Sequence, residues 1–274
     1  MISDYKSAVA NIRKILRRYL SENNLKSLVV GISGGIDSAL TVALAKPVCD
    51  ELKIPLIGRS ITIETNKEDE IKRAKAVGKD FVTDFKEVDL TEGFKILIDL
   101  IIEEGDEELS SVQYKIRRGN IKARTRMVYL YDLAAKNQGM VLSTDNYTEL
   151  LLGFWTLHGD VGDYGMIQNL WKTEVYAMSR YIVLQLQDDT TKNALNSCID
   201  AVATDGLGIT NSDLDQIQAK SYEEVDQILL KLIYNTNDLK DFENHPVIKR
   251  KRNSEFKRNN PYNIPREEIT KEPL

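Results

Sequence analysis

Apolar residues along the chain alternate between continuous runs and stretches with a helical repeat. Residues 3–20 place apolar side chains every three or four positions, with basic residues between them, which is typical of an amphipathic helix. Residues 27–32 form an apolar run, typical of a strand buried on both faces. Further strands are predicted at 54–58, 81–85 and 140–143. Further helices are predicted at 39–52, 66–79, 91–113 with an acidic, mobile interruption at 103–108, 120–137, 172–187, 211–218, 221–233 and 239–256. Strands that alternate with helices predict an α/β fold, with a parallel sheet covered by helices on both faces.

Length and composition narrow the class of protein. The chain has 274 residues, of which 42% are hydrophobic and 29% are charged, so we expect one large globular domain over residues 1–258. The segment 259–274 contains three prolines and is predicted to be an extended tail. The net charge of −5 argues against nucleic acid and membrane surfaces as partners. The N-terminus lacks an apolar signal-peptide core, and we therefore expect a cytoplasmic protein.

A cluster of basic residues near the C-terminus is the exception to this acidic balance. A solvated helix face is the favoured interpretation, and nucleic-acid binding is the alternative. The residues are Lys249, Arg250, Lys251, Arg252, Lys257 and Arg258.

Cysteine and histidine usage argues against a disulfide framework and a zinc site. Cys49 and Cys198 lie among apolar neighbours, and we interpret them as core thiols rather than nucleophiles. The two histidines, His158 and His245, are too few for a typical zinc site with cysteines at this spacing. A bound metal should therefore be a hard cation held by carboxylates and phosphate.

The segment Ser33-Gly34-Gly35-Ile36-Asp37-Ser38 carries the strongest chemical signal. It lies between a predicted buried strand and a predicted helix, so backbone amides and a positive helix end point at one place. Glycines allow the close approach of an anionic oxygen, and Asp37 is a candidate metal ligand. The segment lacks the lysine of the ordinary ATPase loop. We predict a phosphate-binding turn, with a purely local Gly- and Ser-rich connection as the alternative.

Two further groups should lie near this turn. In open parallel sheets, ligands bind beyond the carboxyl ends of the strands, which places Arg59 and the segment Thr144–Glu149 at the same edge. Asp37 and Glu149 could hold one Mg²⁺ between them, since Mg²⁺ commonly takes one or two carboxylates plus phosphate oxygens and water. Glu149 could equally complement a helix dipole.

The turn resembles the signature of ATP pyrophosphatases, which cleave ATP between the α and β phosphates. Later segments resemble NAD synthetases within that group. They are the run from Gly119 to Met127, the run from Thr144 to Glu149, and the pairs Gly153-Phe154 and Gly159-Asp160. The resemblance covers most of the chain, and it implies the adenine nucleotide alpha hydrolase-like, Rossmann-like three-layer fold.

The resemblance also implies roles for individual residues. It assigns ATP binding to Gly31, Ser33, Gly34, Gly35, Asp37, Ser38, Arg59, Thr144, Lys172 and Thr204. It assigns deamido-NAD binding to Asn120, Arg124, Asp163 and Lys257. Asp37 and Glu149 are the implied Mg²⁺ ligands, while Asp160 and Lys172 are the implied catalytic residues. A solvated charged face stays an even alternative for the neighbouring Lys122 and Arg126.

Three departures from the family pattern concern the dinucleotide site. Leu157 stands where a lysine is commoner, and Phe256 stands where a histidine is expected beside Lys257. One residue is also missing between Asp160 and Lys172. These departures leave the reaction class unchanged and weaken the residue map of the dinucleotide site.

The implied activity is the ATP-dependent amidation of nicotinic acid adenine dinucleotide (deamido-NAD) by ammonia, which yields NAD, AMP and pyrophosphate through an acyl-adenylate. About thirty residues precede the turn, too few for a glutamine-hydrolysing domain, so free ammonia is the expected donor unless a separate subunit delivers it. The family is dimeric, which implies a homodimer. Two alternatives are another ATP pyrophosphatase, such as a tRNA-thiolating or GMP synthetase-like enzyme, and a non-catalytic adenine-nucleotide-binding protein. The first predicts a cysteine pair or a basic RNA-binding domain, and the second predicts loss of the metal carboxylates.

Overall fold

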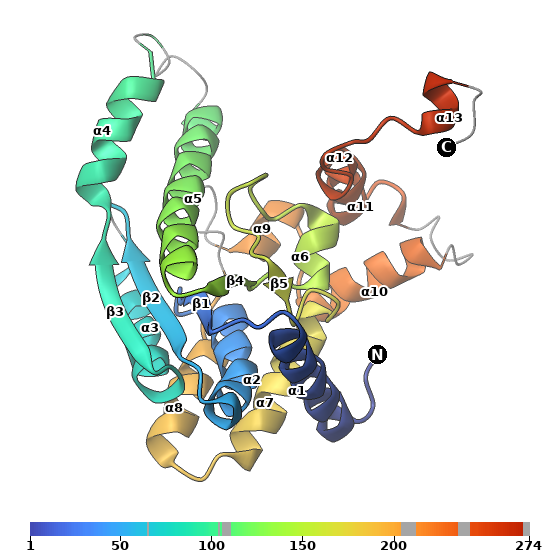
Figure 1. Cartoon of the computed structure of the whole chain (residues 1–274). Coiled ribbons are helices and arrows are strands. Elements are labelled where there is room, and N and C mark those ends of the chain that lie inside the picture. The colour runs from blue at the N-terminus through green and yellow to red at the C-terminus, as the bar shows by residue number, and fades with distance from the viewer. Residues whose placement is uncertain (65, 104, 106–110, 204–211, 235–241, 271–274) are drawn as a thin grey trace.

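Five parallel strands form the centre of the molecule in the computed structural model, which describes residues 1–64, 66–103, 105, 111–203, 212–234 and 242–270 (Figure 1). The strands are β1 (Ser27–Gly31), β2 (Leu56–Thr62), β3 (Asp84–Asp89), β4 (Gly139–Ser143) and β5 (Tyr164–Gly165). Their order in the sheet is β3-β2-β1-β4-β5. The chain leaves β1 in one direction and returns on its other side as β4. At such a switch point, ligands generally bind beyond the carboxyl ends of the strands.

Two hydrophobic clusters cover the two faces of this sheet. On β1, Leu28 and Val30 pack into one cluster, while Val29 packs into the other. The first cluster also contains α1 (Tyr5–Glu22), α2 (Ile36–Leu52), α3 (Glu68–Phe81), α7 (Lys172–Gln185) and α8 (Asp189–Ile199). The second contains α4 (Thr91–Ile101) and α5 (Ser111–Lys136). The predicted three-layer α/β architecture is confirmed.

A third cluster lies beyond the carboxyl end of β4 and contains mostly C-terminal helices (Figure 1). Its helices are α6 (Tyr147–Leu152), α9 (Asp213–Ile217), α10 (Tyr222–Ile233) and α11 (Pro246–Asn253). Two short helices follow, α12 (Glu255–Arg258) and α13 (Arg266–Ile269). This cluster holds α6 and α10 against the edge of the sheet at which ligands are expected.

Three strands differ from the sequence-based prediction, and one of them, the two-residue β5, was not predicted at all. The strand predicted at 81–85 is wrong: Phe81 ends α3 and is buried in the first cluster, and the strand is Asp84–Asp89. Because β3 lies at the sheet edge, its side chains are only partly buried and its pattern is weak. β2 also extends to Thr62, four residues beyond the predicted end at residue 58.

The helices differ mainly at their ends. The helix predicted over 91–113 ends at Ile101 as α4, residues 111–113 belong to α5, and most of the predicted interruption lies outside the described residues. α5 begins at Ser111, nine residues before the predicted start, and runs through Gly119 without a break. α6 and α8 were not predicted, and the single helix predicted over 239–256 is divided into α11 and α12, with 239–241 outside the described residues. In the tail, Arg266–Ile269 is helical rather than extended. Among the described helices, none combines the length and apolarity needed to cross a membrane.

Candidate active site

The predicted phosphate-binding turn, Ser33–Ser38, is named the phosphate loop; it joins β1 to the first turn of α2 and is shaped by backbone groups. Gly34 has a φ of +82°, and a Cβ at this position would lie 2.3 Å from the carbonyl oxygen of Glu70. Glycine fits both constraints, whereas any other residue would be strained. The Ser38 hydroxyl donates to the Gly35 carbonyl oxygen at 3.1 Å, and the Ser33 hydroxyl accepts from the Gly35 amide at 3.2 Å. The first turn of α2 follows directly, so its amides offer an anion-binding site.

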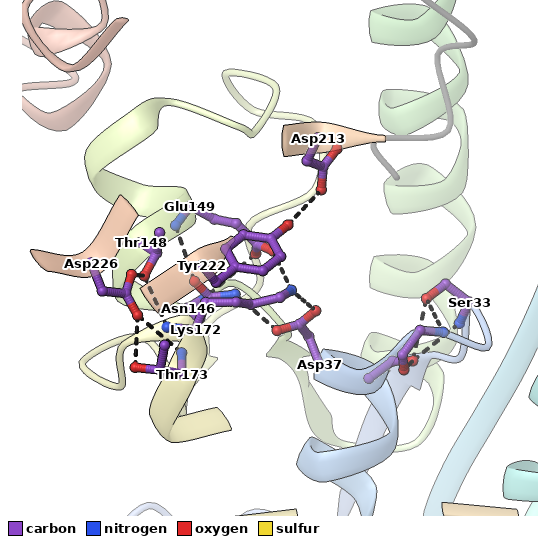
Figure 2. A network of polar contacts seen from close by, with 12 residues as sticks. Ser33, Asp37, Asn146, Thr148, Glu149, Lys172, Thr173, Asp213, Tyr222 and Asp226 are labelled. Carbon is purple, nitrogen blue, oxygen red and sulfur yellow. Dashed lines mark hydrogen bonds and ion pairs between the residues drawn. The ribbon is translucent and has the colours of Figure 1, made fainter. Parts of the chain in front are cut away.

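Asp37, Glu149 and Lys172 converge beside this loop from the first turns of α2, α6 and α7 (Figure 2). The Lys172 Nζ atom lies 2.6 Å from Asp37 Oδ2 and 2.9 Å from Glu149 Oε1. The Lys172 side chain is only 1% exposed. The structure therefore brings the predicted metal carboxylates and the predicted phosphate lysine into one ion-paired group.

Two residues at this group were not assigned to the site from the sequence. The Asn146 side-chain amide donates to Asp37 Oδ1 at 2.8 Å, while its carbonyl oxygen accepts from the Glu149 amide at 3.0 Å. The Tyr222 ring lies 5.5 Å from Lys172 Nζ. Asparagine three residues before glutamate is a capping-box pattern and could have identified Asn146. Tyr222 begins a helix that the sequence predicts, and its ring reaches Lys172 because α10 packs against α7.

Burial and mutual charge shift the protonation of this group. Burial first, and then the charge of Asp37, raise the pKa of Glu149 to about 7. Burial alone would lower the pKa of Lys172, but the charges of Asp37 and Glu149 outweigh it and raise that pKa well above its ordinary value. Lys172 therefore stays cationic at neutral pH, whereas Glu149 titrates near neutrality. A cation bound beside Glu149 would lower its pKa.

The loop 153–160 carries Asp160 and is held from both sides. The Asp160 carboxylate accepts from the Thr156 amide at 2.8 Å and keeps solvent-exposed surface. Crowding by protein atoms raises its pKa to about 6, against the opposing Thr156 hydrogen bond and the charges of Lys257 and Arg126. Asp160 is thus partly protonated near pH 6 and suited to accept a proton at neutral pH.

Three of the four residues predicted to bind deamido-NAD contact this loop. The Arg124 guanidinium donates to the Leu157 carbonyl at 3.1 Å, and the Asn120 side chain accepts from the Thr156 hydroxyl at 2.9 Å. The Lys257 ammonium donates to the Gly153 carbonyl at 2.7 Å and also to the Trp155 carbonyl. The structure gathers Asn120, Arg124 and Lys257 around Asp160, where they position the loop.

Asp163 and Arg59 have partners away from the ion-paired group. Asp163 accepts from the Tyr131 hydroxyl at 2.8 Å and from the Val141 amide at 3.1 Å, which joins the segment after the 153–160 loop to α5 and β4. Arg59 is buried and donates to the Asp84 carboxylate at 2.8 Å. In this structure both side chains join neighbouring elements: Asp163 contacts α5 and β4, and Arg59 joins β2 to β3.

The other predicted ATP contacts have simpler positions. Gly31 ends β1 beside the loop, with the side chain of Leu130 3.4 Å from where its Cβ would be. Thr144 follows β4 and is half-buried. Thr204 lies outside the described residues.

The basic residues near the C-terminus stabilise α6. Arg258 donates to the carbonyls of Leu150 and Leu151 at 3.2 and 2.6 Å, and Arg250 donates to that of Leu152 at 3.0 Å. These carbonyls lie at the C-terminus of α6, where cations are favourable. The prediction of a solvated face is therefore wrong for Arg250, Lys257 and Arg258, which hold the helix that carries Glu149.

Cys49 and Cys198 are buried free thiols. Burial raises the pKa of Cys49 to about 12 and that of Cys198 to about 11, so both stay protonated at neutral pH. The interpretation as core thiols is confirmed.

Comparison with known proteins agrees with this geometry. The family model described as NAD synthase matches residues 8–261, nearly the whole chain. The chain belongs to the NAD synthase family. It is therefore an enzyme, a ligase that forms a carbon–nitrogen bond and uses ATP, as the sequence predicted. The two alternatives, another ATP pyrophosphatase and a non-catalytic nucleotide-binding protein, gain no support.

The three relatives described next match this chain over nearly the whole length of both proteins. An NH(3)-dependent NAD(+) synthetase from Thermoplasma acidophilum is 31% identical over 264 residues, which cover 95% of this chain and 98% of the relative. Among solved structures, an NMN synthetase from Francisella tularensis is 20% identical with a TM-score of 0.76, and 96% of this chain matches 99% of that one. An NH3-dependent NAD synthetase from Campylobacter jejuni is 22% identical with a TM-score of 0.70, and 96% of this chain matches all of that one. At these identities, the two solved structures support the NAD synthase family fold.

Proposed function

We propose that this NAD synthase family member joins ammonia to deamido-NAD at the expense of ATP and releases NAD, AMP and pyrophosphate. The observation that carries the proposal is the ion-paired group of Asp37, Glu149 and Lys172 beside the phosphate loop. The relatives named NH(3)-dependent NAD(+) synthetase support ammonia as the nitrogen donor. A cytoplasmic location stays a prediction from the sequence.

Asp37 and Glu149 fit Mg²⁺ by the chemistry of their oxygen atoms. They come from different elements, and a cationic nitrogen already lies between them, so this position favours positive charge. Among the described residues, no group of three or more His, Cys, Asp or Glu could hold a metal. The remaining ligands would be ATP phosphate oxygens and water. Bound there, Mg²⁺ would neutralise phosphate charge.

The first chemical step needs a good leaving group on the carboxylate of deamido-NAD. That carboxylate attacks the α-phosphorus of ATP, pyrophosphate leaves, and an acyl-adenylate forms. The amides of the phosphate loop and the Lys172 ammonium stabilise the negative charge on the triphosphate during this step. No protein nucleophile is needed, which agrees with the buried, protonated state of both cysteines.

The second step places ammonia on the activated carbon. Asp160 orients an ammonium ion and accepts one of its protons, and the resulting ammonia attacks the carbonyl carbon and displaces AMP. The pKa of Asp160, about 6, lets the carboxylate be the dominant form at neutral pH and still take up a proton.

A homodimer is supported by an apolar surface along one side of the molecule. Tyr19 on α1 packs on Tyr164 of β5 with ring centroids 4.8 Å apart. Val128 on α5 is 73% exposed, and the exposed Tyr131 reaches Asp163, next to Tyr164. This side, defined by α1, β5 and α5, would lose exposed apolar surface against a second copy.

Product analysis tests the reaction. The purified protein is incubated with ATP, Mg²⁺, ammonium and deamido-NAD, and NAD, AMP and pyrophosphate are separated by chromatography. We expect the three products in equal amounts, and we expect glutamine not to replace ammonium. Formation of ADP and orthophosphate, or nucleotide cleavage that does not depend on deamido-NAD, would refute the proposal. Nicotinic acid mononucleotide, tested in parallel, measures how much the adenylate half of the substrate contributes.

A further inference from the structure

Asp226 lies near the site on α10, and it contacts neither the phosphate loop nor the ion-paired group in the structure (Figure 2). Its side chain has no exposed surface. Its Oδ1 atom accepts from the Thr148 hydroxyl at 2.5 Å. Its Oδ2 atom accepts from the Thr173 amide at 3.0 Å and the Thr173 hydroxyl at 2.8 Å. One buried carboxyl group therefore joins three helices: α10, α6 and α7.

The two threonines are each next to a residue of the ion-paired group. Thr148 precedes Glu149 in α6, and Thr173 follows Lys172 in α7. The Thr148 hydroxyl also accepts from the Lys172 amide at 2.9 Å, so the two helix starts are joined directly as well as through Asp226. The distance between the Glu149 and Lys172 backbones is thus set by a continuous hydrogen-bond network.

α10 contributes a second contact one turn earlier. Tyr222 precedes Asp226 by four residues, so both side chains lie on the same helix face. The Tyr222 ring covers Lys172, and its hydroxyl donates to Asp213 at 3.2 Å. This face of α10 therefore encloses Lys172 from one side and fixes its helix from the other.

A buried carboxyl group is costly unless its hydrogen bonds are satisfied, and a hydrophobic residue would often give equal stability at such a place. The Asp226 carboxylate accepts three hydrogen bonds. Although Asp226 belongs to α10, its carboxylate contacts the first turn of α7, where the helix dipole favours negative charge. The presence of a buried carboxyl group at position 226 is therefore better explained by the geometry that it gives the site than by a gain in folding stability.

We propose that Asp226 is a positioning residue that, through Thr148 and Thr173, sets the separation of Glu149 and Lys172 for phosphoryl chemistry. The proposal rests on the roles proposed above for Glu149 and Lys172. Small displacements of such groups reduce the reaction rate strongly, by up to about 100-fold for a shift of about 1 Å.

Four variants test the network. Asp226→Asn and Thr148→Val remove one hydrogen-bonding partner each with little change of volume, and Thr148→Ser keeps the hydroxyl. The control is Ser179→Ala, which removes a buried hydroxyl on α7 that donates only to the Val175 carbonyl, within its own helix. For each variant, kcat, the KM for ATP and the urea-induced unfolding midpoint are measured.

We expect kcat to fall by about 10- to 100-fold in Asp226→Asn and Thr148→Val, while the KM for ATP changes less than about threefold, because phosphate-loop binding is intact. Thr148→Ser should recover kcat to within about threefold of the original protein, and Ser179→Ala should leave kcat within about twofold. If kcat stays within twofold in both network variants, or falls as much in Ser179→Ala, the proposal is wrong.

A measurement on the ligand-free protein keeps this test separate from the activity. Lys172 is buried and strongly paired, so it should resist acetylation by acetic anhydride, followed by peptide mass spectrometry. We expect faster labelling of Lys172 in Asp226→Asn and Thr148→Val than in Ser179→Ala, and equal labelling would overturn the proposal. An unaltered protein that makes no NAD would refute the proposed function, and the labelling result would still decide the role of Asp226.

Discussion

Three ionisable side chains at the site are held in environments that shift their proton affinity. Glu149 and Asp160 have pKa values raised to about 7 and about 6, mainly by burial and crowding, while the pKa of Lys172 lies well above its ordinary value. The carboxyl groups therefore titrate near neutrality and the lysine does not. Such pKa shifts are typical of functional sites, where side chains bind charged ligands or exchange protons.

The raised pKa of Glu149 predicts a pH-dependent stability of the ligand-free protein. Between the unfolded pKa near 4.5 and the folded pKa near 7, the native state binds more protons than the unfolded state, so stability falls as pH rises. We expect the unfolding free energy to drop between pH 5 and pH 8, with Glu149 contributing on the order of 2 kcal/mol. Urea titrations at several pH values measure this, and Glu149→Gln should flatten the curve. A Glu149→Gln curve as steep as that of the original protein would contradict the assignment.

Substitution of Asp160 should slow the second proposed chemical step and leave the first step intact. In Asp160→Asn, the amide cannot accept a proton from ammonium, so we expect kcat for NAD formation to fall by about 10²- to 10⁴-fold. The acyl-adenylate step should continue, and deamido-NAD-dependent exchange of labelled pyrophosphate into ATP measures it. Unchanged ammonia-dependent turnover in this variant would exclude a role for Asp160 in proton transfer.

Among the structural elements, three helix starts meet at one point. α2, α6 and α7 begin beside the phosphate loop, so their positive ends favour bound anions there. α6 has six residues and is held at both ends, by the Asn146 cap at its start and by cations from α11 and α12 at its end. A helix this short depends on such contacts rather than on its own propensity.

The phosphate loop requires glycine at one position in particular. Gly34→Ala places a Cβ against the Glu70 carbonyl with a positive φ, so we expect a loss of about 1–3 kcal/mol in unfolding free energy, together with weaker ATP binding. Gly93→Ala is the matched control, because Gly93 lies in α4 with nothing within 4 Å of its Cβ position. That change should be neutral or stabilise by up to about 1 kcal/mol. Urea unfolding and ATP titration calorimetry measure both, and equal effects in the two variants would contradict the constraint at Gly34.

At the scale of the whole molecule, the sheet separates two helical layers and a third cluster is joined to its ligand-binding edge. The C-terminal helices α10 to α12 therefore act on the site from outside the sheet. At one end of the sheet lies β5, a two-residue strand. Tyr164 of β5 packs on Tyr19 of α1, and the neighbouring Asp163 accepts from Tyr131 of α5. An apolar side at a sheet edge is a suitable surface for a second copy.

Val128→Asp tests the proposed dimer. Val128 is 73% exposed in one chain, so the change should alter the stability of the single chain by less than about 0.5 kcal/mol. In the dimer it would bury an unpaired charge, and we expect the protein to sediment as a monomer in analytical ultracentrifugation. Leu184→Asp, on α7 and 78% exposed, is the control and should stay dimeric. A dimeric Val128→Asp variant, or a monomeric original protein, would refute the α1, β5 and α5 surface.

The sequence alone determined the elements whose structure depends on residues a few positions apart, mainly the buried strands and the glycine-bearing loop. The buried strands β1 and β4, the glycine-bearing loop and the position of Asp37 at the start of α2 follow from short patterns, because apolar runs and glycines act within a few positions. The helix α6 was not predicted, although its capping box spans only Asn146 to Glu149. The edge strand β3 was misplaced for the same reason, since half-exposed residues at a sheet edge leave little pattern.

Only the tertiary structure decided which distant side chains meet. Lys172 and Asp37 are 135 residues apart, and Lys257 and Gly153 are 104 apart. Packing of the three clusters joined Lys172 to both carboxylates, directed Arg59 to Asp84 and placed Asp226 beneath α6 and α7. The physical reason is that a charged side chain takes the partners that the folded core brings within hydrogen-bond distance, and its neighbours in the sequence do not specify them.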